Sequence, residues 1–385
     1  MRIFLILSFS LLTKVLATQI TWTTGTIPNS PNGVFRELAF AFNPSTNTLF
    51  AAWGDLSSTI PYYSTFDGTT WSAAAQITGS STSRYGKVSL AFNPTTNTMF
   101  AAWADPMLSY QPSYSTFDGT SWSAPQPIDA SAAANYNVTL AYNPDTASMF
   151  AAWEDATSNY PTYSTFSSGA WSTSAAIDTS YIYDVVALAF DPTTNAMFAA
   201  WSSANSTPIA LPMFSIFSGG SWSPAAQISS TKQVELYVML GFDSAKNAMF
   251  AGWGDYTTYV PYYTIYSGSW STPATISATS SVDENVDFAF NPSTNMMIST
   301  WIESNGFLPY YSLFDGNAWN SPSAIPGVTT TNSGSVTIIY DPAIEAFVAG
   351  WTEVVAPYRA YYSVGVPSLQ TSERAYHRPQ NRRTR

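Results

Sequence analysis

A tryptophan recurs along this chain at an almost constant interval of about fifty residues. The surrounding pattern is clearest in residues 90–122, LAFNPTTNTMFAAWADPMLSYQPSYSTFDGTSW. The first series consists of Trp53, Trp103, Trp153, Trp201, Trp253, Trp301 and Trp351, and a second series follows at Trp71, Trp122, Trp171, Trp222, Trp270 and Trp319. A fixed period of this length is typical of repeat proteins, in which each repeat is one structural unit that packs on the next.

Each repeat contains four segments with the character of β-strands. The first is a short apolar run such as Val88–Phe92, which ends at Asn-Pro or Asp-Pro in six repeats. A tight turn follows, in which an asparagine such as Asn97 tolerates the left-handed conformation. The second strand is apolar at consecutive positions, so we expect both of its faces to be buried. The third strand ends at an Asp-Gly, Ser-Gly or Gly-Gly pair, which predicts a primed hairpin turn before the fourth strand.

The two ends of the repeat region complement each other. Trp22 belongs to a fragment that resembles the end of a repeat, and the seventh repeat stops without its second tryptophan. The simplest interpretation is a circular arrangement in which the N-terminal strand completes the last repeat. The sequence therefore predicts an all-β fold, a seven-bladed β-propeller of four-stranded antiparallel blades, closed by the N-terminal strand.

The segments outside the repeats differ in composition. Met1–Ala17 has one basic residue before an apolar run and small residues at its end, which is typical of a secretory signal peptide and too short for a membrane span. We therefore expect a signal peptide at 1–17, the propeller at 18–366, and a basic disordered tail at 367–385. The protein is expected to be secreted.

Composition excludes several kinds of site. The chain has no cysteine, and its one histidine, His377, lies outside the repeats, so disulfides, thiolate metal sites and histidine-based catalysis are excluded from the propeller. Residues 18–366 carry six Lys/Arg against 23 Asp/Glu. An acidic body of this kind repels phosphate backbones, so nucleic acid is not an expected partner.

The junction between the third and fourth strands carries a resemblance to a known family. Ser64–Trp71 reads STFDGTTW, and it resembles the Asp-box (BNR) pattern Ser-x-Asp-x-Gly-x-Thr-Trp of the sialidase-like propeller superfamily, with the aspartate displaced by one position. Ser115–Trp122 is similar, whereas the third to fifth repeats have no aspartate there. The resemblance implies a propeller in which this turn is structural. Members of the superfamily include sialidases, other glycosidases and non-catalytic binding propellers.

An acidic residue follows the first-series tryptophan by two positions in six repeats. These acids are Asp55, Asp105, Asp155, Asp255, Glu303 and Glu353. Each should lie where the chain enters the long loop after the second strand. One interpretation is a ring of polar anchors for sugar hydroxyls or a Ca²⁺ ion. The other is that each acid accepts hydrogen bonds from the backbone of its own loop.

Two further sets of loop residues are candidates for ligand binding. The first set consists of loop tyrosines that the repeat does not require, so their rings are free to stack on a ligand. They are Tyr110, Tyr160, Tyr181, Tyr183 and Tyr259. The second set is Arg36, Arg84 and Arg359, which should share one sector of the loop-bearing face. A guanidinium group binds carboxylates in a bidentate manner, so this sector suits an acidic sugar. The alternative is local pairing with nearby acidic side chains.

The sequence favours an exported, non-catalytic binding propeller that recognises glycans or a cell-surface partner. A glycoside hydrolase of the sialidase-like kind is the alternative, although the propeller holds only three arginines and Phe35-Arg36 matches half of the Phe-Arg-Ile-Pro element of sialidases. A purely structural exported protein is the third possibility. We expect a monomer without a cofactor, with calcium possible through the acidic ring.

Overall fold

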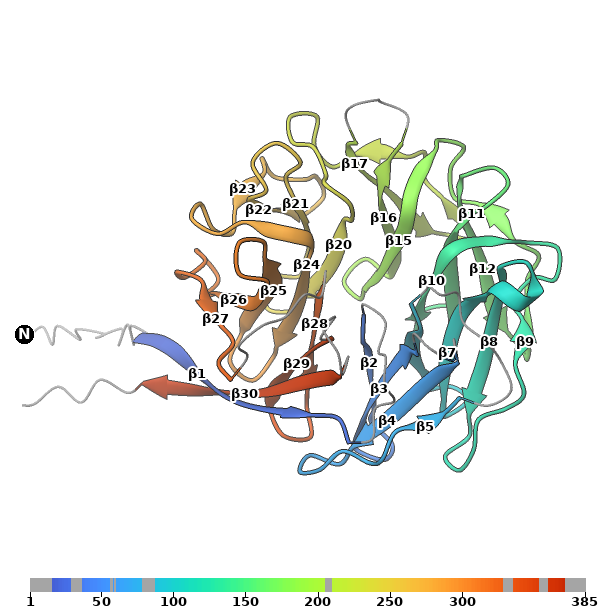
Figure 1. Cartoon of the computed structure of the whole chain (residues 1–385). Coiled ribbons are helices and arrows are strands. Elements are labelled where there is room, and N and C mark those ends of the chain that lie inside the picture. The colour runs from blue at the N-terminus through green and yellow to red at the C-terminus, as the bar shows by residue number, and fades with distance from the viewer. Residues whose placement is uncertain are drawn as a thin grey trace, which may run out of the picture.

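The structure is a computed structural model that describes residues 16–28, 37–55, 58, 60–77, 87–204, 210–327, 335–352 and 359–370. Seven antiparallel sheets are arranged in a ring around a central axis, as Figure 1 shows. The predicted all-β seven-bladed propeller is therefore confirmed. Within the described residues, no helix is long and apolar enough to cross a lipid bilayer.

The first four blades follow one another along the chain. Blade one contains β2 (Ala39–Asn43), β3 (Thr48–Gly54), β4 (Pro61–Phe66) and β5 (Ala75–Gln76). Blade two contains β6 (Ser89–Asn93), β7 (Thr98–Asp105), the 3-10 turn η1 (Pro106–Leu108), β8 (Gln111–Phe117) and β9 (Gln126–Pro127). Blade three contains β10 (Ala134–Asn143), β11 (Ser148–Asp155), β12 (Pro161–Ser167), β13 (Ala170–Trp171) and β14 (Ala175–Ala176). Blade four contains β15 (Ile182–Asp191), β16 (Ala196–Ser203), β17 (Pro212–Ser218), β18 (Ser221–Trp222) and β19 (Ala226–Gln227).

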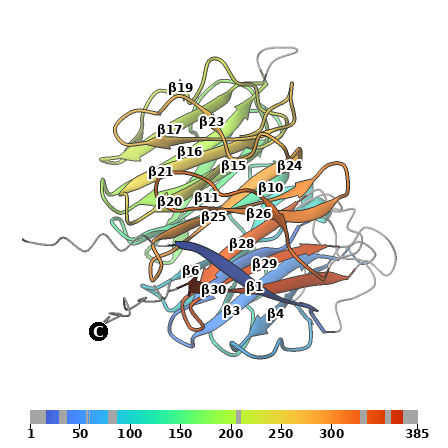
Figure 2. The same ribbon diagram turned by 90° about the vertical axis from the view of Figure 1, so that its left-hand side faces the viewer.

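The last three blades complete the ring. Blade five contains β20 (Met239–Asp243), β21 (Ala248–Gly254), β22 (Pro261–Tyr266) and β23 (Ala274–Thr275). Blade six contains β24 (Val282–Asn291), β25 (Met296–Glu303), β26 (Leu308–Phe314) and β27 (Ser323–Ala324). Blade seven contains β28 (Val336–Asp341), β29 (Ala346–Thr352), β30 (Ala360–Gln370) and β1 (Leu16–Thr26). The first strand of each blade packs against the first strand of the next, including β28 against β2, so these strands surround the axis (Figure 1). Figure 2 shows the same ring from the side.

The ring is closed by the N-terminal strand. β1 pairs with β30 in the sheet order β1-β30-β29-β28, with an uninterrupted register from Gln19↔Ser368 to Thr26↔Tyr361. The Trp22 ring lies 5.3 Å from the Tyr311 ring of blade six. In the same way, the Trp122 ring of blade two lies 5.4 Å from the Tyr63 ring of blade one. Trp22 thus supplies the second tryptophan that blade seven lacks.

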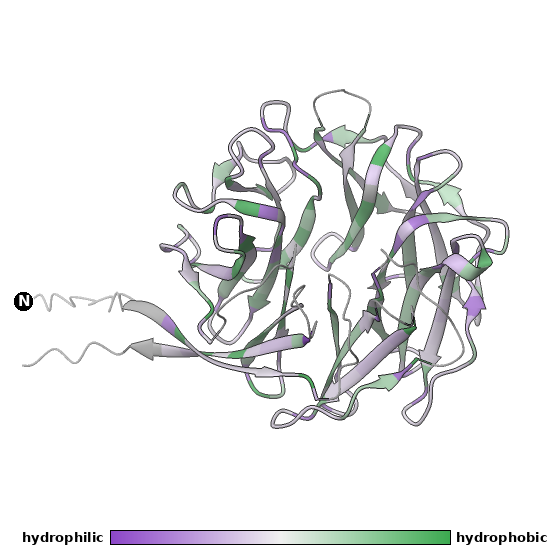
Figure 3. Cartoon of the chain, viewed as in Figure 1, coloured by the Kyte–Doolittle hydropathy of each residue, from purple (hydrophilic) through white to green (hydrophobic). Residues whose placement is uncertain are grey.

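The first-series tryptophans form the core between blades. All seven are fully buried, and the second strands that carry them are buried on both faces, as their continuous apolar pattern predicts. Figure 3 shows hydrophobic residues along the strands and hydrophilic residues mostly in the connections. These tryptophans therefore hold the scaffold together and are not available to a ligand.

The turns between first and second strands match their prediction. In blade two, Asn93 Oδ1 accepts the backbone N–H of Thr95 at 2.9 Å, and Asn97 has a φ of 55°. The same φ region recurs at the equivalent position of every blade: Asn47, Asn97, Ala147, Asn195, Asn247, Asn295 and Glu345. One local motif therefore builds all seven turns.

The turns between third and fourth strands match their prediction only in part. Ser168 and Gly169 both have positive φ, as do Gly219 and Gly220, so blades three and four have the predicted primed turn. In the Ser267-Gly268 pair of blade five and in the Asp-Gly pairs, only the glycine has a positive φ, so the prediction is wrong there. In the Asp-Gly loops the aspartate organises a different turn: Asp67 Oδ1 accepts the N–H groups of Thr69 and Thr70, both at 2.8 Å. These hydrogen bonds lower the pKa of Asp67, and the bond from the backbone of Thr70 has the largest effect.

The boundaries of the propeller follow the β1–β30 pairing. β1 begins at Leu16 and β30 continues to Gln370, beyond the boundary expected at residue 366. In Figure 1 the two strands leave the ring together as a ribbon. Most of the predicted signal peptide, residues 1–15, and the basic segment 371–385 lie outside the described residues.

Candidate functional site

Two kinds of connection meet on one face of the ring. The loops from second to third strands hydrogen-bond to the segments that lead into the next blade, for example Ala134 N to Tyr110 O at 2.7 Å and Ile182 N to Asn159 O at 3.1 Å. We call this end the loop face and the opposite end, with the tight turns, the turn face. The loop face carries every candidate site residue that the structure describes.

The acids of the predicted ring bind their own loops. Asp55 accepts the N–H of Ser58 at 2.7 Å, and Asp155 accepts the N–H of Ser158 at 2.8 Å. Asp105 accepts the N–H of Met107 at 3.0 Å and so begins η1. These hydrogen bonds fix the conformation of the loops that follow the second strands.

Asp255 and Glu303 follow the same principle in blades five and six. Asp255 accepts the N–H of Thr258 at 3.1 Å, and Glu303 accepts the N–H of Gly306 at 2.9 Å. Burial raises the pKa of Glu303, but hydrogen bonds from Ser281, Asn305 and Gly306 outweigh it and hold that pKa below its usual value. The turn-capping interpretation therefore describes all five acids that are in the described residues, whereas Glu353 lies outside them.

The predicted arginine sector falls largely outside the described part of the chain. Arg36 and Arg84 lie outside it, and Arg359 is exposed directly before β30. An acidic ligand at this sector remains a prediction.

The first strands of blades three and four, β10 and β15, are extended at their beginnings. Both are ten residues long, as is β24 of blade six, whereas β2, β6 and β20 have five. The extensions contain register shifts between Ala134 and Val138 in β10 and between Tyr183 and Val186 in β15. Such bulges change the direction of side chains and are frequent beside functional sites. Tyr136, within the β10 bulge, has a φ of 72°, which is unusual for an aromatic residue.

The two extended strands form the sides of a pocket on the loop face. It has a volume of about 410 Å³, within the usual range for small-molecule sites. β10, β11 and β15 lie in adjacent blades (Figure 1). The lining residues are Asn135, Tyr136, Glu154, Asn159, Tyr181, Ile182, Tyr183 and Ala204.

Tyrosine side chains continue from this pocket along the loop face. The Tyr110 ring lies 5.6 Å from the Tyr136 ring in an edge-to-face arrangement, and the Tyr160 ring lies 5.7 Å from the Tyr181 ring. Tyr181 and Tyr183 are about half exposed, at 49% and 52%. The structure thus places the predicted Tyr110 and Tyr160 beside the pocket and in contact with tyrosines that line it.

Sequence reasoning identified two of the eight lining residues, Tyr181 and Tyr183. Glu154 follows Trp153 directly and was hidden by the neighbouring Asp155, which belongs to the repeated acid pattern. Tyr136 and Asn135 are positioned by a bulge, which has no short sequence signature. One signal was present for Glu154: the equivalent residue in the other repeats is small or apolar or a hydroxyl residue, never an acid.

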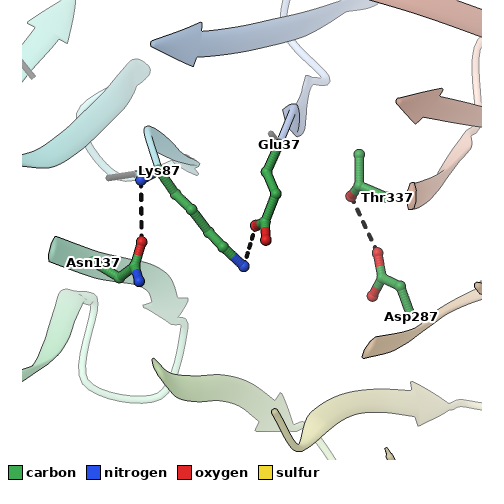
Figure 4. A network of polar contacts seen from close by, with 5 residues as sticks. All are labelled: Glu37, Lys87, Asn137, Asp287 and Thr337. Carbon is green, nitrogen blue, oxygen red and sulfur yellow. Dashed lines mark hydrogen bonds and ion pairs between the residues drawn. The ribbon is translucent and has the colours of Figure 1, made fainter. Parts of the chain in front are cut away.

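A second cavity, of about 220 Å³, lies at the axis and is lined by the first strands. Lys87 of blade two forms an ion pair there with Glu37 of blade one, and its ammonium group lies 4.8 Å from the centre of the Tyr237 ring. Figure 4 shows this pair opposite Asp287 and Thr337. These charges are engaged with one another and with neighbouring strands, so this cavity is a polar part of the core.

Asp287 connects blades six and seven. Its carboxylate accepts the N–H of Ile338 at 3.0 Å and the hydroxyl of Thr337 at 3.1 Å, both from β28. The first strands that surround it remove it from bulk water, and this desolvation raises its pKa despite those hydrogen bonds and the charge of Lys87. Ser89 makes the equivalent contact between blades two and three, where its Oγ accepts the N–H of Leu140 at 3.0 Å.

Comparison with solved structures agrees with the propeller. The β-propeller domain of Cps50 (Swd1) from Myceliophteria thermophila is similar over 90% of this chain and 99% of that chain, with 10% identity and a TM-score of 0.56. The polysaccharide lyase Uly1 is similar over 88% of this chain and 90% of that chain, with 11% identity and a TM-score of 0.53. NanB sialidase from Streptococcus pneumoniae, in a variant form, matches 88% of this chain and 70% of that chain, with 8% identity and a TM-score of 0.50. At these identities the similarity shows the fold alone.

No protein-family model matches the sequence, and no curated protein does. Among the residues with described positions, no three acidic, histidine or cysteine side chains gather in a group suited to a metal ion.

Proposed function

We propose that this protein is an exported, non-catalytic propeller that binds carbohydrate in the pocket between blades three and four. The observation that carries the proposal is the meeting of three tyrosines, two asparagines and one carboxylate in a single pocket of about 410 Å³. These residues come from β10, β11, the loop after β11, and β15 with the residue before it, which lie in two adjacent blades.

The chemistry of the lining suits a sugar. A pyranose has an apolar face of C–H groups and a rim of hydroxyl groups. The exposed rings of Tyr181 and Tyr183 offer flat apolar surfaces for that face, with hydroxyl groups at their edges. Asn135 and Asn159 both donate and accept hydrogen bonds, as sugar hydroxyls require. A polysaccharide lyase and a sialidase share the fold, so the scaffold is compatible with a carbohydrate ligand.

A glycoside hydrolase remains the alternative function. Hydrolysis by the common mechanisms requires two carboxyl groups that flank the scissile bond. Among the described lining residues of the pocket, Glu154 is the one carboxylate, while Asp155 next to it is bonded to its own loop. These observations favour binding without turnover. A purely structural role would leave the pocket without a ligand.

We also propose that the mature domain is secreted and monomeric and needs no cofactor. Removal of residues 1–17 would leave the β1–β30 register from Gln19 onward intact, so export by a cleaved signal peptide is compatible with ring closure. A cell-surface glycan or glycoprotein is then the expected partner. A melting temperature that rises with Ca²⁺ and falls with EDTA would instead support calcium at the acidic residues of the loop face.

A glycan array tests the proposal. The wild-type mature protein should bind a limited group of glycans, and Tyr183→Ala should weaken that binding by about tenfold or more, because the substitution removes a stacking surface. Tyr256→Ala is the matched control, since Tyr256 is exposed to a similar extent, 48% against 52%, in a loop of blade five. Binding to no glycan, or equal binding by the two variants, would overturn the proposal. Release of sugar from fluorogenic glycosides would favour the hydrolase.

A further inference from the structure

Glu154 occupies a position that is buried in every blade. Its equivalents are Gly54, Ala104, Ser202, Gly254, Ile302 and Thr352, none of which carries a charge. Glu154 itself is only 4% exposed and lines the pocket between blades three and four. The repeat does not require a carboxylate at this position. Glu154 is therefore the residue that gives this pocket a charge of its own.

The electrostatic character of the pocket is negative. No lysine or arginine is among its described lining residues, whereas Glu154 contributes a carboxylate. In the described chain the cationic side chains are Lys87, Lys232, Lys246 and Arg359, and these lie in blades two, five and seven. The carboxylate of an acidic sugar would be repelled by Glu154, and low dielectric surroundings strengthen that repulsion.

We propose that the ligand of this pocket is an amino sugar with a free, protonated amino group, such as a glucosamine oligomer. The inference rests on the proposed carbohydrate-binding function and names its ligand class. The ammonium group donates to the Glu154 carboxylate, a charge-assisted hydrogen bond that is stronger than a bond between neutral groups. Tyr136, Tyr181 and Tyr183 present aromatic rings in the same pocket, and the faces of such rings attract cations.

N-acetylation distinguishes this ligand from its close relatives. An acetamido group has no charge, so it replaces the ion pair by a neutral hydrogen bond at best. A charged hydrogen bond in a desolvated site exceeds a neutral one by enough to change affinity about tenfold. The pocket should therefore prefer glucosamine oligomers to N-acetylglucosamine oligomers of the same length, and glucuronic acid oligomers should bind most weakly.

Calorimetric titration of the full mature protein with these three oligomers at mildly acidic pH tests the inference. We expect the glucosamine oligomer to bind about tenfold more tightly than its N-acetylated counterpart, and an ionic strength of about 1 M to reduce the difference through screening. Equal affinities, or tighter binding of the N-acetylated or acidic oligomer, would overturn the inference while the proposed function stands. Failure of all three and of every array glycan would overturn both.

Two variants locate the effect. Glu154→Gln keeps the shape of the side chain but removes its charge, so the preference for the free amine should fall to nearly one. Asp145→Asn is the matched control, because Asp145 is an exposed acid of the same blade in a turn of the turn face. A glucosamine preference that persists in a folded Glu154→Gln protein would assign the preference to another group. If that variant does not fold, the comparison of oligomers on the wild-type protein still decides.

Discussion

At the scale of single residues, the fifth position of the turns between first and second strands accepts residues other than asparagine. The residue there has a left-handed backbone in all seven blades, and five blades place asparagine at it. Ala147 and Glu345 adopt the same conformation with φ values of 48° and 51°. An alanine pays the steric cost of its Cβ in this region without the local hydrogen bonds that an asparagine side chain makes.

Ala147→Asn should therefore stabilise the protein by about 0.5–1 kcal/mol. The free energy of unfolding from urea titration, monitored by tryptophan fluorescence, measures the change. The reverse substitution in blade two, Asn97→Ala, is the matched control and should destabilise by a similar amount. A loss of stability in Ala147→Asn would contradict the idea that the left-handed backbone at this position costs stability in the wild type.

At the scale of elements, the closure between β1 and β30 depends on a close contact between the backbone of Gly365 and the indole ring of Trp22. A Cβ atom at Gly365 would lie 2.6 Å from Trp22 Cζ3, so a larger residue there forces the two strands or the indole ring apart. Gly365→Val should destabilise the propeller by about 1–3 kcal/mol or more, as overpacking in cores does.

Thermal unfolding of Gly365→Val against wild type measures this effect. Val366→Ala serves as the control because Val366 is adjacent but 51% exposed, and it should leave the melting temperature almost unchanged. Deletion of residues 18–28 removes the strand altogether and should lower the melting temperature further. An unchanged melting temperature in the deletion would show that the ring does not need this strand.

The elements also show which features the sequence could predict. The tryptophan period, the Asn-Pro turns and the unmatched Trp22 fragment were sufficient for seven blades and their closure, because these signals recur or complement one another. The bulges in β10 and β15, like the one in β24, depend on pairing with the next strand, so no local sequence pattern predicted them. The primed-turn prediction was wrong for the Asp-Gly pairs, where the side chain of Asp67 competes for the backbone N–H groups of its loop. It was also wrong for Ser267-Gly268, where a three-residue loop connects Tyr266 to Trp270. Tyr110 and Tyr160 were identified because the repeat does not need them, whereas Glu154 was obscured by its neighbour.

At the scale of the whole molecule, the axis is the place where distant blades interact. Lys87 lies between Glu37 and the Tyr237 ring, and its charge acts on Asp287. The ionised form of Asp287 is disfavoured in the folded protein, because its pKa is raised above the unfolded value of about 3.8. The contribution of this group to stability is therefore fully present below that value and is lost as the pH rises through the folded pKa.

Asp287→Ser tests this dependence, since a serine in the position of Ser89 accepts the equivalent backbone N–H without a charge. On acidification from neutral pH, the free energy of unfolding of the wild type should improve relative to Asp287→Ser. Paired urea titrations across this range measure the difference. A difference that is constant with pH would contradict a raised pKa. Asp287→Ala, which leaves the N–H of Ile338 without its acceptor, should cost about 1–3 kcal/mol at any pH.

The pairing of β1 with β30 also sets the order of events during synthesis. The hydroxyl of Ser368 bonds to the carbonyl of Gln19 across 349 residues of chain. β1 is synthesised before the other strands of the ring, so it waits for its neighbour until all seven blades have been translated. Contacts of such long range slow folding, and during this delay the unpaired strand edge is open to association with other chains. For a protein that crosses a membrane unfolded, the same delay would keep the ring open until transport is complete.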